Sequence, residues 1–297
     1  MKKNRGNEIT FNLMLAPGMI LLILFSIVPM FGIVMAFQNY MPARGILGSK
    51  WVGMANILYL FQLPESIQAV RNTLVIATAK IITSLFFPLL FALSLHAVRT
   101  RWLKKISQTI VYLPFFLSWV ILASTLQNIL DLHGPINQFI SRLGIEKIQF
   151  LISKTWFRPI LVITDTWKNL GYNTVIYLAA IVSIDPSLYE AAEMDGASKF
   201  KQLVYITMPG IMSTIVLLST LSLGNVLNAG FDQVFNMYNP LVYSTGDILD
   251  TYIYRVGLVQ AQFGLATAVG LFKSIVSMIL ILISYKLAEK FANYRIF

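Results

Sequence analysis

The chain has 297 residues, of which 57% are hydrophobic and only 12% are charged. Ordinary soluble domains carry about 25% charged residues, so this composition excludes a soluble globular protein and indicates the lipid bilayer as the surroundings. Because the chain has no cysteine and only two widely separated histidines, we expect no disulfide, no iron–sulfur or thiolate zinc site, and no histidine metal cluster. The net charge of +10 would suggest nucleic acid in a soluble protein, but here the position of each basic residue relative to the membrane matters more.

Six apolar runs predict an all-α polytopic membrane protein, because each is near the ~20 residues that cross a bilayer as a helix. In chain order they cover about residues 13–37, 73–97, 106–126, 160–182, 211–231 and 267–285. The first run follows three basic residues, as a signal peptide would, but it is too long for a signal core and no small-residue cleavage site follows. We therefore expect the first run to be retained as a span.

Basic residues set the expected orientation. Six spans place both termini on the same side, and the segments on that side hold twelve lysines and arginines, against eight in the longer segments on the other side. Since basic residues concentrate on the cytoplasmic side, we predict that both termini are cytoplasmic. The whole of 1–297 then forms one membrane domain, with 1–12 as a cytoplasmic N-terminal segment and 183–209 as a cytoplasmic loop.

The loop between the fourth and fifth spans carries the clearest local signals. Asp185 before Pro186 is typical of a helix start, and Gly196 is suited to the left-handed conformation that ends a helix. These signals predict a short helix, a sharp turn, and a second short helix from Ser198 to about 207, with Pro209 at the start of the fifth span. Small side chains on this element suit close contact with a partner, but an amphipathic helix lying on the inner leaflet fits the composition equally well.

The spacing Glu190-Ala-Ala, Gly196, Ile206 and Pro209 resembles the EAA loop of ABC importer permeases. The similarity extends over nearly the whole chain and includes Leu15–Gly18, Phe25–Pro29, Trp51–Gly53, Arg71–Leu74, Tyr112–Pro114 and Gly230–Pro240. These stretches are similar to the carbohydrate-importing branch, and most of all to permeases for complex sugars and oligosaccharides.

The resemblance implies a bacterial cytoplasmic-membrane permease subunit that imports a carbohydrate. It would work with a second homologous permease, two ATP-binding subunits and an extracellular or periplasmic solute-binding protein. The loop would be the coupling helix that docks on the ATPase, through residues expected to form or shape the contact: Glu190, Ala191, Ala192, Asp195, Gly196, Ala197 and Pro209. No Gly-x4-Gly-Lys-Ser/Thr phosphate loop occurs in the chain, so ATP and Mg are expected in the partner subunits, and this chain is expected to bind no cofactor and to have no catalytic residue.

Polar residues within the spans suggest a translocation path. Ionisable groups are costly in lipid, so Lys80, Asp165, Lys168 and Lys273 should face protein or water. Asp165, Lys168 and Tyr172 share one helical face by their spacing, and the same spacing relates Asn225, Asn228 and Asp232. The side chains suited to sugar hydroxyls and sugar ring faces in this region are Trp119, Asp165, Trp167, Tyr172, Asn173, Asn225 and Asn228.

A structural role is the competing interpretation of each of these polar residues, because amides and ion pairs also join helices in membrane bundles. We expect Lys80 and Lys273 to pair with Asp165 or with an unsatisfied backbone carbonyl rather than to contact sugar. Two other functions stay open from the residues alone. One is an ion-driven transporter that uses Asp165 with Lys80, Lys168 or Lys273, and the other, which lacks suitably placed residues, is an intramembrane enzyme.

Overall fold

Long apolar segments fold as helices because a helix satisfies its own backbone hydrogen bonds in lipid. The computed structural model describes the backbone of residues 5–98 and 100–292, and within these residues the regular structure is almost entirely helical. Two short strands, β1 (Gln38–Asn39) and β2 (Lys50–Trp51), form an antiparallel pair with Gln38 opposite Trp51. The predicted all-α class is therefore confirmed.

The chain divides into two compact units, and the smaller unit takes residues 1–63 and 253–272. It begins with α1 (Arg5–Leu22), a π turn (Ile23–Ile27), α2 (Val28–Met30) and a 3-10 helix (Phe31–Phe37), which together carry the first apolar run. The strand pair encloses a 3-10 turn (Pro42–Arg44) and α3 (Gly45–Gly48), and α4 (Ala55–Gln62) follows. A second π turn (Arg255–Val259) and the first part of α16 (Phe263–Ala292) complete this unit.

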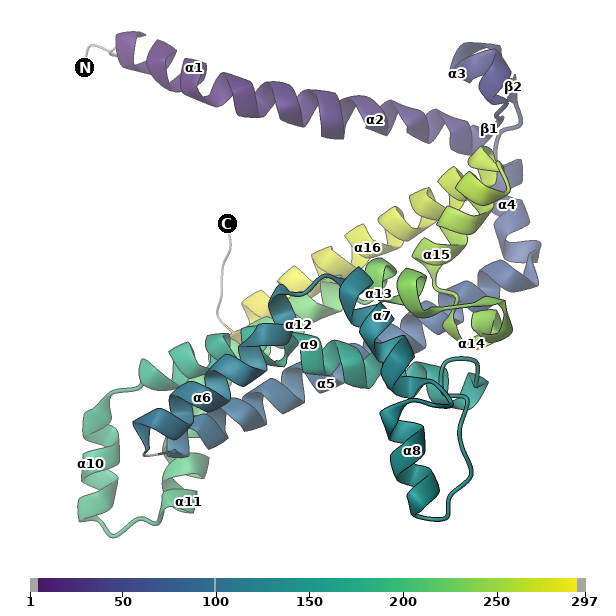
Figure 1. The fold of residues 1–297 in the computed structure, drawn as a ribbon. Coiled ribbons are helices and arrows are strands. Elements are labelled where there is room, and N and C mark those ends of the chain that lie inside the picture. The colour runs from purple at the N-terminus through teal and green to yellow at the C-terminus, as the bar shows by residue number, and fades with distance from the viewer. Residues whose placement is uncertain (1–4, 99, 293–297) are drawn as a thin grey trace. The chain divides into compact units, whose positions relative to one another are not determined.

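The larger unit, residues 64–252 and 273–297, is built around two long helices that lie side by side, α5 (Pro64–Ala97) and α9 (Lys154–Val182) (Figure 1). The other elements before α10 are α6 (Arg101–Tyr112), a 3-10 helix (Leu113–Phe116), α7 (Trp119–Leu130) and α8 (Pro135–Arg142). After α9 come α10 (Pro186–Met194), α11 (Lys199–Gln202), a π turn (Leu203–Thr207) and α12 (Met208–Gly224). Then follow α13 (Phe231–Met237), a 3-10 turn (Pro240–Val242), α14 (Tyr243–Gly246), α15 (Leu249–Tyr254) and the rest of α16.

Four continuous helical runs are long and apolar enough to cross a membrane: Phe11–Phe37, Pro64–Ala97, Lys199–Gly224 and Phe263–Lys290. Two further candidates are bent pairs, Arg101–Phe116 with Trp119–Arg142 and Lys154–Val182 with Pro186–Met194. The count reaches six if each bent pair is one span, in agreement with the six predicted runs. Most apolar side chains of the first run are exposed, as expected of a surface that lipid or another membrane protein covers.

The third predicted span, residues 106–126, is wrong as a single helix. The chain turns by 106° between the 3-10 helix that ends at Phe116 and the start of α7. Pro114 has no N–H to continue the ladder of α6, and Ser118 starts a new helix by accepting a hydrogen bond from the Ile121 N–H at 3.4 Å. Pro114 and the Ser118 cap thus divide the predicted span into two helices.

The fifth span also differs from its prediction at both ends. The second short helix of the loop continues through the π turn into α12, so Lys199–Gly224 is one helical run. At its other end α12 stops at Gly224, seven residues before the predicted end at 231, and a turn leads to Gly230, whose positive φ of 89° starts α13. Residues 225–230 thus form a non-helical connection that hydropathy alone does not show.

Candidate functional site

The loop after α9 forms a compact, well-capped element. Asp185 accepts a hydrogen bond from the Ser187 N–H at 2.9 Å and so caps the start of α10. At the other end Gly196 has φ +73°, the Gly196 N–H donates to the Glu193 carbonyl, and the Ala197 N–H donates to the Ala192 carbonyl. This pair of bonds is a Schellman motif, so the predicted helix and its glycine turn are confirmed.

The surface of α10 and α11 is largely open. Glu190, Ala191, Asp195 and Gly196 are exposed, Ala192 and Ala197 are half-buried, and α10 has no fully buried residue. Large apolar side chains stand out beside them, with exposed fractions of 88% for Met194, 73% for Phe200 and 75% for Tyr205. A short rigid helix with small residues and exposed apolar neighbours is suited to a protein contact.

Pro209 lies in the second position of α12, directly after the π turn Leu203–Thr207. A proline cannot donate to the carbonyl four residues back and its ring crowds that carbonyl. The turn before Pro209 is wider than an α-helical turn, because the Met208 N–H bonds five residues back to the Leu203 carbonyl. The same arrangement occurs at Pro29, where the Val28 N–H bonds to Ile23.

The interior of the larger unit contains a polar cluster around Lys80. Its ammonium group donates to the Ala229 carbonyl at 2.7 Å and to the Gln233 side-chain oxygen, and it lies 3.5 Å from the Asp165 carboxylate. Gln233 in turn donates to the Leu161 carbonyl and the Thr164 hydroxyl, both at 2.8 Å. The predicted pairing of Lys80 with Asp165 and with a backbone carbonyl is confirmed, and the cluster ties α5, α9 and α13 together.

Lys168 binds backbone carbonyls at the break between α6 and α7, as Lys80 does at the connection before α13. Its ammonium group donates to the carbonyls of Pro114 at 3.2 Å, Phe115 at 3.0 Å and Leu117. An ammonium has three N–H donors, so these three acceptors take all of them. Lys168 therefore stabilises the end of a broken helix and has no donor left for a substrate in this conformation.

Lys273 has a different partner from the one predicted. It forms an ion pair with Asp250 of α15, not with Asp165 or a backbone carbonyl. Asp165 is paired with Lys80, and Asp250 lies in the first turn of α15, a helix that hydropathy does not mark as a span. The sequence separation of 23 residues exceeds any helical spacing, so the pair was not visible in the sequence.

Several structural polar residues were missed in the sequence. Asn72 is fully buried and donates to the Asp247 carbonyl at 2.9 Å, while Arg158 donates to the Asn72 side-chain oxygen at 2.7 Å and to the Thr245 carbonyl at 2.9 Å. Thr73 accepts the Leu249 N–H at 2.8 Å. These bonds hold the irregular segment around α14 against α5 and α9. Two of these residues, Asn72 and Thr73, lie in the Arg71–Leu74 stretch that carried part of the family resemblance, so that stretch was a signal for them.

The predicted sugar-path residues lie in three places. Asp165, Trp167, Tyr172 and Asn173 are on α9, and Trp119 begins α7. Asn225 caps the end of α12, and Asn228 lies in the connection before α13. The prediction that Asn225, Asn228 and Asp232 share one helical face is wrong, because the helix ends at Gly224. Both asparagines are nevertheless exposed, as are Trp167 and Tyr172.

An aromatic stack lies next to the α6–α7 break. The rings of Phe115 and Tyr172 are parallel, with centroids 4.6 Å apart, and the Lys168 ammonium lies 5.6 Å from the Trp119 ring centroid. Phe115 covers one face of Tyr172, and the Tyr172 side chain is 54% exposed. An exposed aromatic ring near polar groups is chemically suited to a sugar ring face.

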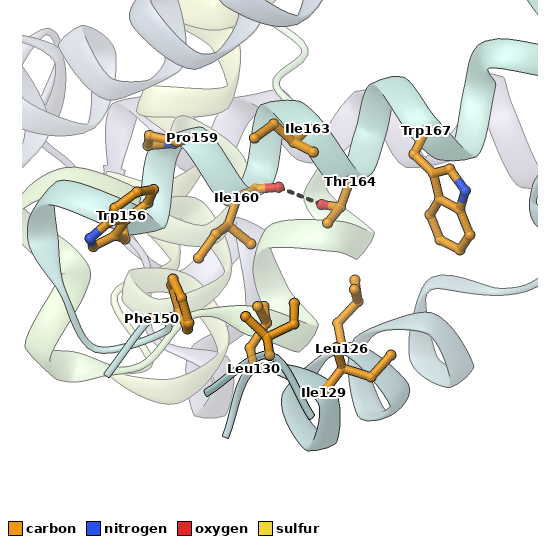
Figure 2. A pocket seen from close by; sticks show the side chains of 11 residues that line it. Leu126, Ile129, Leu130, Phe150, Trp156, Pro159, Ile160, Ile163, Thr164 and Trp167 are labelled. Carbon is orange, nitrogen blue, oxygen red and sulfur yellow. Dashed lines mark hydrogen bonds between the residues drawn. The ribbon is translucent and has the colours of Figure 1, made fainter. Parts of the chain in front are cut away.

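A separate cavity of about 410 Å³ lies between α7, the segment around Phe150 and α9 (Figure 2). Its lining is apolar: Leu126, Ile129, Leu130, Ile136, Phe150, Trp156, Pro159, Ile160, Ile163, Thr164 and Trp167. The single hydroxyl there, on Thr164, donates to the Ile160 carbonyl at 2.6 Å. Apart from the indole N–H groups of Trp156 and Trp167, this lining offers a sugar no free hydrogen-bond partner, so the cavity is not a carbohydrate site by itself.

Within the residues that the structure describes, no group of three or more acidic or histidine side chains is placed to hold a metal ion. His133 lies exposed in a loop, and its backbone carbonyl accepts a hydrogen bond from the Gln138 side-chain amide at 2.7 Å. The polar clusters described above are therefore built from amides, hydroxyls and ion pairs.

Comparison with known families and proteins adds an independent line of evidence. The family described as "Binding-protein-dependent transport system inner membrane component" matches residues 84–293. The Polygalacturonan/rhamnogalacturonan transport system permease protein YteP of Bacillus subtilis (strain 168) is 44% identical over 286 residues, which cover 96% of this chain and 89% of that protein. Protein LplB of the same organism is 41% identical over 286 residues, covering 96% and 90%.

Solved structures agree with these relatives. A chain of a bacterial alginate ABC transporter, in complex with alginate pentasaccharide-bound periplasmic protein, has a TM-score of 0.90 and 34% identity, with 98% of both chains covered. A chain of a bacterial ABC transporter involved in the import of the acidic polysaccharide alginate has a TM-score of 0.88 and 35% identity, with 97% of this chain and 99% of that chain covered. Sequence and fold thus resemble the same class of proteins.

Proposed function

Because the chain belongs to the family of binding-protein-dependent transport system inner membrane components, we propose that it is the permease subunit of an ATP-driven carbohydrate importer in a bacterial cytoplasmic membrane. The 297 residues act as one permease domain with both termini in the cytoplasm. A second homologous permease completes the pore, and a solute-binding protein delivers the carbohydrate from outside. The chain itself is a membrane permease component and not an enzyme.

The observation that carries the coupling role is the capped, exposed α10 element. Glu190, Ala191 and Ala192 lie on α10, Asp195 to Ala197 form its Schellman turn, and Pro209 fixes the start of α12. We propose that α10 docks on one of two partner ATP-binding subunits, where ATP and Mg are held. A helix that is capped at both ends frays less, because partners satisfy the backbone groups at its ends. Such a helix moves as a unit when its partner moves.

Glu190→Ala and Gly196→Val test this assignment, with Glu146→Ala in the loop between α8 and α9 as the matched control. We expect the first two variants to lose ATPase attachment or sugar uptake while the protein keeps its monodisperse elution in detergent. The control should behave like the parent chain. Parent-like uptake and parent-like ATPase retention in both loop variants would reject α10 as the coupling element.

The assembly itself is testable by mild purification from the native membrane, followed by mass spectrometry of the chains that co-purify. We expect a second multi-span permease and an ATP-binding subunit. Since the chain has no cysteine, Ala191→Cys then provides a single cross-linking site for mapping the ATPase contact. Recovery of the chain alone from several mild detergents would favour an ion-driven transporter instead.

For the substrate, we infer an oligosaccharide from an acidic polysaccharide, on the strength of the relatives' names and the exposed aromatic and amide groups of this chain. Trp119, Tyr172 and Asn173 offer ring faces and an amide near the α6–α7 break. Asp165 and Trp167 lie earlier in α9, and Asn225 and Asn228 lie at and after the end of α12. Tyr172→Ala and Asn228→Ala should each raise the sugar concentration for half-maximal uptake, because each removes an exposed sugar-compatible group. Uptake assays with oligogalacturonate and lactose distinguish an acidic from a neutral preference.

An ion-driven mechanism remains the second candidate because Lys80 and Asp165 form an ion pair within the spans. The hydrogen bonds of Lys80 to Ala229 and Gln233 favour a structural role for this pair. Depletion of ATP should abolish uptake, whereas collapse of the proton and sodium gradients at constant ATP should not. The reverse result would favour the ion-driven mechanism.

A further inference from the structure

The attachment of α10 to the rest of the larger unit depends on few side chains. Within the described residues, the side chains of α10 are exposed except for Tyr189 and Ala192, which are half-buried. The Tyr189 hydroxyl lies 2.9 Å from the Thr207 hydroxyl, close enough for a hydrogen bond with either oxygen as donor. The Tyr189 ring also lies 6.3 Å from the His96 ring at the end of α5. Tyr189 therefore bridges α10 to the start of α12 and to α5.

Thr207 is a well-fixed anchor for this bridge. Its side chain is 3% exposed, and its hydroxyl also reaches the Gln202 carbonyl at 3.4 Å. Gln202 is 4% exposed, and its amide donates to the Ala197 carbonyl at 3.5 Å, which returns the network to the glycine turn after α10. The loop is thus closed by a ring of polar contacts through Tyr189, Thr207, Gln202 and Ala197.

Thr207 lies where the loop joins α12, so its contact with Tyr189 links α10 to that helix. Thr207 is the last residue of the π turn Leu203–Thr207, in which Pro209 has removed the ordinary backbone bond to the Tyr205 carbonyl. Single π turns within α-helices occur frequently at functional sites. The bond between Tyr189 and Thr207 joins α10 to the end of this turn, and the contact of Thr207 with the Gln202 carbonyl spans the turn itself. Side chains therefore tie together a segment whose backbone lacks one bond.

We propose that the hydrogen bond between Tyr189 and Thr207 makes α10 and the first turn of α12 move as one body, so that both residues are positioning residues for coupling. The inference rests on the proposed coupling role of α10. Neither residue needs to touch the ATPase or the sugar. Loss of either hydroxyl should let α10 move without α12, and ATP would then be hydrolysed with less sugar moved.

Tyr189→Phe and Thr207→Val each remove one hydroxyl and keep the shape of the side chain, while Thr207→Ser keeps the hydroxyl. Tyr59→Phe is the matched control, because Tyr59 is 49% exposed and lies on α4, outside the α10–α12 element. In proteoliposomes with the assembled importer, we expect the first two variants to lower the sugar moved per ATP by roughly two- to tenfold, the range of one net hydrogen bond. Thr207→Ser and Tyr59→Phe should keep the parent ratio.

The double variant Tyr189→Phe with Thr207→Val should be no worse than Thr207→Val alone, since that single variant already lacks the bond to Tyr189 together with the contact between Thr207 and the Gln202 carbonyl. Parent-like ratios in both single variants, or fully additive losses in the double variant, would overturn the inference. Failure of the parent chain to assemble with an ATPase would instead reject the proposed function, so the two failures are distinguishable.

A second measurement does not need the importer. Ala191→Cys and Ser213→Cys place two spin labels on α10 and α12 of a chain that has no other cysteine. Electron–electron distance measurements on the purified full chain should give one narrow distribution, which Thr207→Val broadens and Thr207→Ser does not. Identical distributions in all three backgrounds would also contradict the inference.

Discussion

At the scale of single residues, two of the three lysines expected within the spans, Lys80 and Lys168, act as caps for broken helices. Lys80 binds the Ala229 carbonyl at the connection between α12 and α13, and Lys168 binds three carbonyls at the break between α6 and α7. Carbonyl groups that lack a partner in an apolar interior cost free energy. A buried ammonium next to each break supplies those partners, so the charges and the irregular backbone stabilise one another.

We predict that Lys168→Met lowers the stability of the folded chain by about 1–3 kcal/mol, because the Pro114, Phe115 and Leu117 carbonyls lose their donor. The measurement is the thermal midpoint of the detergent-solubilised protein, followed by fluorescence-detected gel filtration. Lys105→Met is the control, since Lys105 is exposed on α6. Equal midpoints for the Lys168 and Lys105 variants would show that the contacts contribute nothing to stability.

The sequence predicted where these lysines lie but only part of what they contact. The cost of an ionisable group in lipid indicated that Lys80 must have a polar partner, and Asp165 was among the candidates. The contacts of Lys168 depend on a break at Leu117–Ser118 that hydropathy hides, because Leu113–Leu117 is as apolar as a continuous span. Gln233 and Asn72 depend on partners 69 to 175 residues away, and no local pattern encodes such distances.

At the scale of helices and turns, small residues decide how closely two elements approach. Gly171 of α9 faces the end of α6, where a Cβ atom would lie 2.6 Å from the Val111 carbonyl oxygen and 2.7 Å from the Tyr112 Cα. These neighbours are backbone atoms and cannot move aside without moving α6. The crossing of α6 and α9 therefore requires glycine at this position.

Gly171→Ala should cost about 1–3 kcal/mol through overpacking and should displace α6. Gly18→Ala is the matched control, because Gly18 lies in α1 with no atom within 4 Å of the added methyl group. Alanine is the better helix former by roughly 1 kcal/mol, so the control should be neutral or slightly more stable. Thermal midpoints of the two variants measure the difference, and a neutral Gly171→Ala would place the α6–α9 crossing further apart than described.

The helix cap at α10 has a defined pH dependence. Hydrogen bonds from the Ser187 backbone and side chain hold the pKa of the Asp185 carboxyl below its usual range. A lowered pKa in the folded chain means that the cap stabilises α10 at every pH above the ordinary value and is lost as the pH falls through the lowered one. Asp185→Asn should keep the cap and Asp185→Ala should lose it.

Deuterium uptake of the amides of Ser187 to Tyr189 at neutral pH measures the state of this cap. We expect faster exchange in Asp185→Ala than in the parent chain, with Asp185→Asn close to the parent chain. Lowering the pH should increase fraying of α10 in the parent chain but not in Asp185→Asn, once intrinsic exchange rates are normalised. The same pH response in both chains would show that another group controls this end of the helix.

At the scale of the whole molecule, hydropathy predicted the long apolar helices well because the requirement for internal hydrogen bonds leaves few alternatives in lipid. The predictions of the ends of α12 and of an unbroken third span were wrong, because proline, glycine and contacts with distant lysines override the local hydropathy pattern. The family resemblance supplied what composition could not, namely the transport function. The division into two compact units was not visible in the sequence, since residues 1–63 join a later segment, 253–272.

The orientation in the membrane is a prediction at this scale. Met194→Cys at the exposed end of α10 should react with a membrane-impermeant maleimide only after the cells are opened, whereas Glu146→Cys between α8 and α9 should react in intact cells. The cysteine-free parent chain removes background labelling. Labelling of both sites in intact cells, or the opposite pattern, would overturn the cytoplasmic placement of the termini and of α10.

The two lysine-capped breaks also have a consequence for biosynthesis, because the chain emerges from the ribosome N-terminus first. Lys80 has already been synthesised when Ala229 is added, so the Ala229 carbonyl at the break before α13 can bind the Lys80 ammonium as soon as it forms. Phe115 must instead wait for Lys168, 53 residues later. We therefore expect α6 and α7 to stay near the insertion machinery until α9 has been translated, and nascent chains that end between them to be the ones that quality-control proteases remove.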